Sequence, residues 1–193
     1  MKTTTRFNTL AIVEGAVMVA LAVILDMLPL WKMPEGGSVT LAVVPIIYYA
    51  YRRGTLMGCA AGLVWACTQF FTGQWYMPPA NTIGAAALCL ILDYFVPFTV
   101  AGTAPLFAKL LGKFRFAGYA VGAAAVCLLR YVSHIFSGVL LWGSYAGDMN
   151  VWWYSVTYNG AFMLPITALA AVVIVALCAA VDPMTLRPYK RAE

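Results

Sequence analysis

The stretch from Arg130 to Gly160 decides the fold, and it reads RYVSHIFSGVLLWGSYAGDMNVWWYSVTYNG. An arginine and the only histidine, His134, lie inside an apolar run that is long enough to cross a bilayer (about 20 residues). Ionisable side chains at membrane depth are costly, and they usually face a cavity or a partner. A short polar loop and a cluster of aromatic residues follow, and then Asn159 lies just inside the next apolar run. The stretch therefore predicts two membrane helices beside a pocket for a flat organic molecule, cations included.

The composition of the whole chain agrees with a membrane protein. Hydrophobic residues make up 63% of the 193 residues and charged residues only 10%, whereas an ordinary soluble domain has about 25% charged residues. The first apolar run follows two basic residues but lacks a small-x-small cleavage pattern, so it predicts a membrane helix rather than a signal peptide. We expect an all-α integral membrane protein that forms one domain over residues 1–193.

Six membrane-spanning helices are predicted. Their approximate bounds are 8–30, 39–51, 55–71, 81–111, 118–142 and 155–181. The second is short, at about 20 Å for 13 residues. The fourth contains Pro97 and Pro105, which should interrupt it.

The basic residues predict the orientation of these helices. With six crossings, both termini lie on one side of the membrane. That side holds ten of the twelve basic residues: Lys2, Arg6, Arg52, Arg53, Lys109, Lys113, Arg115, Arg187, Lys190 and Arg191. The other side holds only Lys32, and Arg130 lies within a helix. By the positive-inside rule, both termini are expected in the cytoplasm, with the chain crossing the cell membrane.

The tryptophans are distributed unevenly between the two faces. Five of the six fall at or near the outer helix ends, and they are Trp31, Trp75, Trp142, Trp152 and Trp153. An interfacial aromatic belt is one interpretation. A belt should be present at both faces, however, and the inner face has no tryptophan. An outward-facing aromatic pocket explains the asymmetry better.

Four polar residues from three predicted helices lie at comparable depths. At 1.5 Å per residue, His134 and Asn159 lie in the outer half of the membrane, while Asp93 and Arg130 reach about its middle. These four side chains could therefore converge below the outer surface. A simpler alternative is that Asp93 and Arg130 pair with each other, which would not exclude a binding site beside them.

Several kinds of chemistry are not supported by the sequence. One histidine without a nearby cysteine provides too few ligands for a metal. Ser133 and Ser137 flank the histidine, but nothing completes a nucleophilic triad. No glycine-rich phosphate loop is present, so the chain by itself should not hydrolyse nucleotides.

The five cysteines lie in apolar runs, where we interpret them as small hydrophobic residues. The net charge of +5 follows from the topology and does not indicate nucleic acid as a partner. We expect neither an enzyme nor a cofactor.

The first predicted helix has small residues at a spacing of four, including Ala16 and Ala20. Such spacing lets another helix approach closely. The neighbour could be a helix of the same bundle, or the face could dock a separate membrane subunit.

Taken together, these motifs resemble a known family. They are the run MPEGGSVTLA at 33–42, Arg52-Arg53-Gly54, Gly73-x-x-Tyr76, Asp93-Tyr94, the H-x7-W pair from His134, and Tyr154-S-x-x-x-Asn159-Gly. The chain resembles the thiamine-specific substrate-binding (S) component of energy-coupling factor vitamin transporters over nearly its whole length. The resemblance implies high-affinity capture of thiamine from outside, by a subunit that needs a transmembrane coupling subunit and two ATPase subunits for transport.

The same resemblance implies a set of ligand residues. They are Asp93, Tyr94, His134, Trp142, Tyr154 and Asn159, with Tyr76 beside them and Trp31 as an approximate counterpart of a tryptophan in the first outer loop. It also implies that Ala16 and Ala20 contact the coupling subunit. The family's acidic residue is usually glutamate, whereas Asp93 is one methylene shorter.

Thiamine suits such residues. Its thiazolium is a permanent cation, which tryptophan faces attract and a carboxylate can balance. The Asn159 amide and the Tyr154 hydroxyl can match the donors and acceptors of its aminopyrimidine. Two alternatives remain: a self-sufficient small channel or facilitator for an organic cation, and an S component for a related vitamin or a thiamine precursor.

Overall fold

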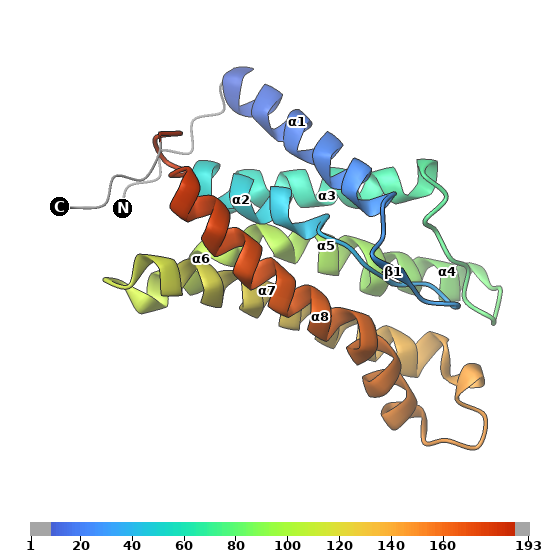
Figure 1. Cartoon of the computed structure of the whole chain (residues 1–193). Coiled ribbons are helices and arrows are strands. Elements are labelled where there is room, and N and C mark those ends of the chain that lie inside the picture. Colours follow the sequence, from blue (N-terminus) through green and yellow to red (C-terminus); the bar gives the residue numbers. More distant parts are fainter. Residues whose placement is uncertain (1–8, 188–193) are drawn as a thin grey trace.

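A computed structural model describes residues 9–187 of the chain. It contains six helical units, as predicted, with little other regular structure (Figure 1). The units are α1 (Thr9–Asp26), α2 (Val43–Arg53), α3 (Thr55–Phe71), an interrupted fourth unit (Ile83–Leu111), α7 (Arg115–Leu141) and α8 (Val151–Ala180). Four of them, namely α1, the fourth unit, α7 and α8, are long and apolar enough to cross a membrane. α3 is apolar but has 17 residues, and α2 has only 11.

One element departs from the all-α prediction. The strands β1 (Trp31–Lys32) and β2 (Ser38–Val39) form a small antiparallel hairpin, in which Trp31 pairs with Val39. Gly36 and Gly37 both have a positive φ, which glycine adopts without steric cost, so the chain can reverse tightly there. Because of the hairpin, α1 ends earlier than predicted and α2 begins later.

The fourth unit changes helical type several times. It consists of α4 (Ile83–Cys89), the π-helical turn η1 (Leu90–Phe95), α5 (Val96–Val100), the 3-10 turn η2 (Ala101–Thr103), α6 (Ala104–Ala108) and the 3-10 turn η3 (Lys109–Leu111). The two predicted interruptions are present, because Pro97 lies in the first turn of α5 and Pro105 in the first turn of α6. Proline fits these first-turn positions, where a missing N–H costs little.

The π-helical turn is sustained by one proline and one serine. In this register, each N–H bonds to the carbonyl five residues earlier, as Val96 N does to Ile91 O. The next donor would be residue 97, but Pro97 has no N–H. The carbonyl of Leu92 is therefore left without that helical partner, and it accepts a hydrogen bond from Ser133 Oγ of α7 at 2.6 Å.

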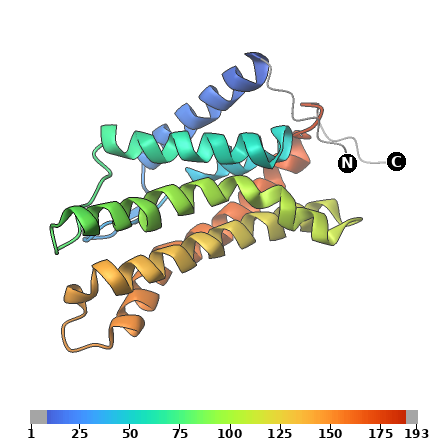
Figure 2. The same ribbon diagram turned by 180° about the vertical axis from the view of Figure 1, so that it is seen from behind.

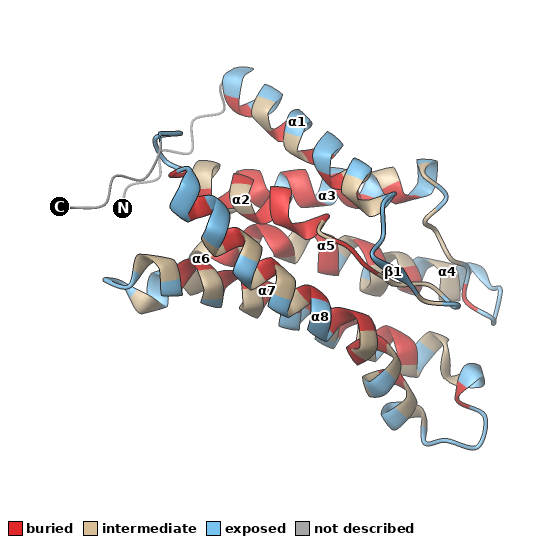
Figure 3. Cartoon of the chain, in the orientation of Figure 1, coloured by how far each residue is buried: buried red, intermediate tan, exposed pale blue. Residues whose placement is uncertain are grey.

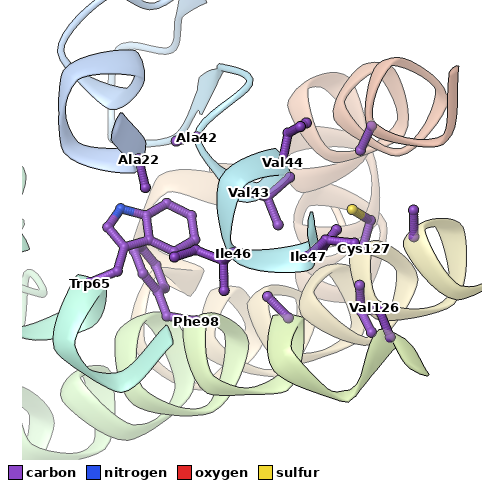
Figure 4. Packing of buried hydrophobic residues seen from close by; sticks show 14 of the residues in the cluster. Ala22, Ala42, Val43, Val44, Ile46, Ile47, Trp65, Phe98, Val126 and Cys127 are labelled. Carbon is purple, nitrogen blue, oxygen red and sulfur yellow. The ribbon is translucent and has the colours of Figure 1, made fainter. Parts of the chain in front are cut away.

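The short helix α2 lies at the centre of the bundle. Eight of its 11 residues are buried, and its valines and isoleucines pack between the Trp65–Phe98 pair and Val126 and Cys127 of α7 (Figure 4). α2 is thus enclosed by protein, so its length of about 16 Å need not match a bilayer. Seen from behind, α3, the fourth unit and α7 lie alongside one another (Figure 2).

The helix α1 packs on the outside of the bundle, where most of its surface is exposed (Figure 3). Its buried residues form one stripe, Ala11, Gly15, Val19 and Ala22, which faces α2 and α3. Tyr49 Oη of α2 donates to the Ala11 carbonyl at 2.7 Å in this contact. The remaining apolar face is free for lipid or another protein.

Ion pairs hold several elements together at one end of the bundle. The carboxylate of Glu14 in α1 lies 2.7 Å from Arg52 Nη2 and 2.6 Å from Arg53 Nε, both at the end of α2. Arg52 Nη1 also donates to the carbonyl of Pro183 beyond α8, at 3.0 Å. The first turns of α1 and the end of α8 therefore meet at the end of the bundle that carries the predicted cytoplasmic arginines.

Candidate ligand-binding site

A cavity opens between the hairpin and the helices of the bundle. Its volume is about 140 Å³. Its walls combine aromatic rings with a few polar and charged groups, an arrangement typical of small-molecule sites. Three carboxylates (Asp26, Glu35 and Asp93) and one guanidinium (Arg130) line it, so the balance of formal charge favours a cation.

The Asp93 carboxylate is the hub of the polar wall. His134 Nδ1 lies 3.0 Å from its Oδ1. Ser137 Oγ donates to Oδ2, and Trp142 Nε1 donates to the same oxygen at 3.3 Å. The thiol of Cys89, one turn before Asp93, donates to the same Oδ2 at 3.4 Å. Asp93 therefore fixes two side chains of α7, and Trp142 at the C-terminal end of that helix, relative to the fourth unit.

The π-helical turn explains how two consecutive residues reach the cavity. Asp93 and Tyr94 both lie in η1 and both line the cavity. In a regular α-helix, neighbouring side chains point about 100° apart. The wider turn changes these directions locally, and π-helical turns are frequent at functional sites.

Asn159 is held in place by its own amide hydrogens. Its Nδ2 donates to the carbonyls of His134 at 3.2 Å and Ser155 at 2.9 Å. Two carbonyl acceptors require the NH₂ group at this position, so the amide oxygen points the other way. Within the described residues, that Oδ1 accepts no hydrogen bond, and Asn159 lines the cavity. Gly138 permits this arrangement, because a Cβ there would overlap Ser155 Oγ.

Aromatic side chains form the rest of the wall. The ring of Trp142 stacks on Tyr145, with the centroids 6.2 Å apart, while its indole N–H is held by Asp93. Tyr154 lies beside Tyr158, at 5.6 Å between ring centroids. Tyr94 uses its hydroxyl within the protein: it accepts from Tyr76 N and donates to Gln74 O, both at 3.0 Å. Tyr94 thus presents its ring and positions Tyr76, rather than offering a free hydroxyl.

The turn of the hairpin covers one side of the cavity. Tyr158 Oη accepts from Glu35 N at 2.9 Å and donates to Gly36 O at 3.0 Å. Gly37 packs so closely on Phe162 that a Cβ would overlap the ring. The hairpin turn, including the exposed Glu35 side chain, is therefore fastened to α8 one residue from Asn159.

Arg130 lies deeper in the cavity than His134. Its guanidinium carbon is 5.2 Å from the ring centroid of Trp65 and 5.3 Å from that of Phe98. The suggested pairing with Asp93 is absent, since no carboxylate of the described residues lies within 4.0 Å of Arg130. Asp93 pairs with His134 instead.

Seven of the eight predicted ligand residues line this cavity: Tyr76, Asp93, Tyr94, His134, Trp142, Tyr154 and Asn159. The exception is Trp31, which lies in β1 with 54% of its surface exposed and outside the cavity wall. The strand pairing of β1 with β2 directs this residue away.

Sequence reasoning missed other parts of the site. Ser137 and Cys89 were interpreted as unremarkable, yet both donate to Asp93. A signal was available, because Ser137 lies three residues after His134 and Cys89 four residues before Asp93, which places each pair on one helical face. Glu35 and Tyr158 gave no such signal, since only the folded hairpin brings them to the cavity.

The chemistry of the site is that of binding. Among residues 9–187, no group of three potential metal ligands lies together. The cavity offers oriented donors, one free amide acceptor, aromatic faces and negative charge, which suit a flat cation with polar edges.

Comparisons with known proteins identify the family of the chain. The family described as Thiamine transporter protein matches residues 12–186. Thiamine transporter ThiT of Bacillus subtilis (strain 168) is 33% identical over 174 residues, covering 84% of this chain and 87% of that protein. Thiamine transporter ThiT of Lacticaseibacillus paracasei is 30% identical over 176 residues, covering 84% of each.

A solved structure gives the same result for the fold. ThiT from Listeria monocytogenes superposes with a TM-score of 0.70 at 25% identity, covering 87% of this chain and 92% of that one. The family match covers nearly all the helices and all the residues that line the cavity. The chain therefore belongs to the thiamine transporter (ThiT) family of multi-pass membrane transport proteins, and it is not an enzyme.

Proposed function

We propose that this protein is the thiamine-binding subunit of an energy-coupling factor transporter, and that the described cavity holds thiamine. The observation that carries the proposal is the Asp93 hub, which presents an indole, an imidazole and a carboxylate on one wall of a cavity with excess negative charge. Its relatives are named thiamine transporters.

The proposed contacts follow from the groups that remain free. Asn159 Oδ1 would accept from the exocyclic amine of the aminopyrimidine, and the Tyr154 hydroxyl can serve a ring nitrogen. The face of Trp142 would attract the thiazolium. Asp93 already accepts from Cys89, His134, Ser137 and Trp142, so it acts mainly by orienting the wall and by long-range attraction in a medium of low dielectric constant.

Transport itself would depend on other subunits. The chain lacks a phosphate-binding loop, and so energy should come from two ATPase subunits through a transmembrane coupling subunit. Ala16 and Ala20 are exposed on α1, one helical step away from the buried Gly15 and Val19. Small exposed residues at this spacing suit close approach of a helix of the coupling subunit. The end of the bundle with Arg52, Arg53 and both described chain ends would face the cytoplasm.

Two measurements test this function. Thiamine should change the tryptophan fluorescence of the purified full chain saturably, because Trp65 and Trp142 line the cavity, whereas the isolated pyrimidine precursor should bind much more weakly. In cells, uptake should need ATP and should vanish when the coupling subunits are deleted. Uptake that persists without them would indicate the facilitator instead.

A further inference from the structure

The guanidinium of Arg130 is buried without a hydrogen-bond acceptor among residues 9–187. Arg130 is only 6% exposed, and none of its nitrogens forms a hydrogen bond with the described residues; its Nε is fully buried as well. Its protein neighbours are the faces of Trp65 and Phe98, which stabilise a cation but accept no N–H in the plane of the guanidinium. The five N–H donors of the guanidinium therefore lie in the cavity wall without an oxygen acceptor from the part of the chain that the structure describes.

Such an arrangement is costly unless something compensates for it. Burying an arginine in the hydrocarbon region costs several kcal/mol, and unpaired donors add to that cost. Met or Leu at position 130 would pack against Trp65 and Phe98 without this cost. An arginine at this position is therefore best explained by an acceptor that comes from outside the described residues, such as a bound ligand.

Arg130 lies in the same cavity as the proposed thiamine contacts. It is four residues before His134 on α7, so the two side chains share a face and Arg130 is about 6 Å deeper. Gln69 and Asp26 line the cavity as well, and Gln69 Nε2 donates to Asp26 Oδ2 at 2.9 Å. Asp26 thus offsets the charge of Arg130 at a distance and is itself occupied.

We propose that Arg130 is a ligand-binding residue that donates hydrogen bonds to an oxygen on the ligand, forming an acceptor subsite separate from the Asp93 hub. The proposal rests on the proposed function, and for thiamine the oxygen is the alcohol of the hydroxyethyl group. A phosphate ester at the same position presents the same acceptor chemistry. The subsite would thus read the one part of thiamine that neither the aromatic wall nor Asn159 recognises.

The test compares three ligands on the wild-type protein, one variant and one control variant. Full-length protein and Arg130→Met are purified in detergent, and calorimetric titrations are run with thiamine, with its analogue in which the alcohol is replaced by hydrogen, and with thiamine monophosphate. Leu129→Met, on the exposed side of the same helix, is the matched control. Wild-type protein should bind thiamine about tenfold or more tightly than the deoxy analogue, because a hydrogen bond to a charged group is lost. Arg130→Met should weaken thiamine by a similar factor and leave the deoxy analogue within about twofold.

Each outcome decides the matter. Equal wild-type affinity for thiamine and the deoxy analogue overturns the subsite, even if Arg130→Met does not fold. An equal loss for both ligands in Arg130→Met also overturns it and assigns Arg130 to packing with Trp65 and Phe98. Tighter binding of the monophosphate, lost in the variant, supports the subsite with phosphate as the acceptor. If the wild-type protein binds no thiamine at all, both the proposed function and the subsite fail. The titration of the wild-type protein is enough to recognise this outcome.

Discussion

His134 Nδ1 lies 3.0 Å from Asp93 Oδ1, and this contact joins α7 to the π-helical turn of the fourth unit. The two residues are 41 positions apart in the sequence. The carboxylate accepts, so Nδ1 carries a hydrogen and the imidazole ring is held in one orientation. In the proposed thiamine site, the aspartate would act on the ligand through the histidine and Trp142, even though it is one methylene shorter than the glutamate expected for the family.

Replacing Asp93 by Asn should weaken thiamine binding by about 1.5–3 kcal/mol, since charge-assisted hydrogen bonds are lost. The NH₂ group of the substituted side chain would also face the hydrogens of His134 and Ser137, and this repulsion would rotate the imidazole ring. Asp148→Asn, an exposed change in the outer loop, is the control and should bind normally. Calorimetric titration of both variants measures the difference, and similar affinities would contradict the central role of Asp93.

Trp142→Ala should weaken thiamine binding by about 1–3 kcal/mol, because stacking and a cation–π contact in a desolvated site are both lost. Trp153 is the natural comparison, since it lies in the first turn of α8 with 61% of its surface exposed and does not line the cavity. Trp153→Ala should change the affinity little. If the two variants lose equal, small amounts, the tryptophans form an interfacial belt rather than a pocket.

Two asparagines near the start of α8 should behave differently. Asn159→Ala should reduce affinity by about 1–3 kcal/mol, because a polar group of the ligand would be buried without its partner. Asn150 caps α8 by accepting from Trp152 N and Trp153 N, at 3.0 and 3.2 Å. Asn150→Ala should cost about 0.5–2 kcal/mol of stability and leave affinity unchanged. Titration of both variants measures the affinity, and thermal unfolding measures the stability. An equal loss of affinity in both variants would contradict the prediction.

The sequence predicted the elements that depend on local composition. Apolar runs gave six helical units, and Pro97 and Pro105 marked real changes in the fourth. The four polar residues at membrane depth all line the cavity, whereas Tyr76, Tyr94, Trp142 and Tyr154 were assigned as ligand residues only through the family resemblance. The predicted convergence of Asp93, Arg130, His134 and Asn159 on one cavity arises because all four lie on helix faces at comparable depth.

The rest depended on contacts between distant segments. The hairpin of β1 and β2 is too short to leave a periodic pattern, so Trp31 was placed in the site while Glu35 was overlooked. The partner of Asp93 was left open between Arg130 and a ligand. The structure gives His134 instead, because the π-helical turn directs Asp93 towards α7, and no composition rule reveals that turn.

Glu35→Gln should weaken thiamine binding by about two- to fivefold, the range for an exposed charge interaction. The same change should not affect a thiamine analogue whose thiazolium is replaced by a neutral ring, since only the charge of Glu35 is removed. The loss should shrink as salt is added, because exposed charges are screened. Titrations with both ligands at low and high salt provide the measurement, and an equal loss for the neutral analogue would argue for a disturbed hairpin.

Ala16→Trp should abolish thiamine uptake in cells that express the coupling subunits while leaving the affinity of the purified chain intact. Bulk on this exposed face of α1 would block close helix approach and would not reach the cavity. Leu128→Trp, on the exposed side of α7, is the matched control and should transport normally. Lost affinity in purified Ala16→Trp would show instead that α1 supports the pocket.

The π-helical turn makes the site depend on the number of residues between Cys89 and Val96. Such a turn holds one residue more than an α-helical turn, so deletion of a single residue there could restore a regular helix with nearly the same length. The helices on either side would keep their relative orientation, but Asp93 and Tyr94 would lose the directions that the wider turn gives them. Hydropathy would hardly change, and the chain would still read as the same membrane helix. Insertions and deletions in this short segment should therefore separate membrane insertion, which they would spare, from ligand recognition, which they would erase.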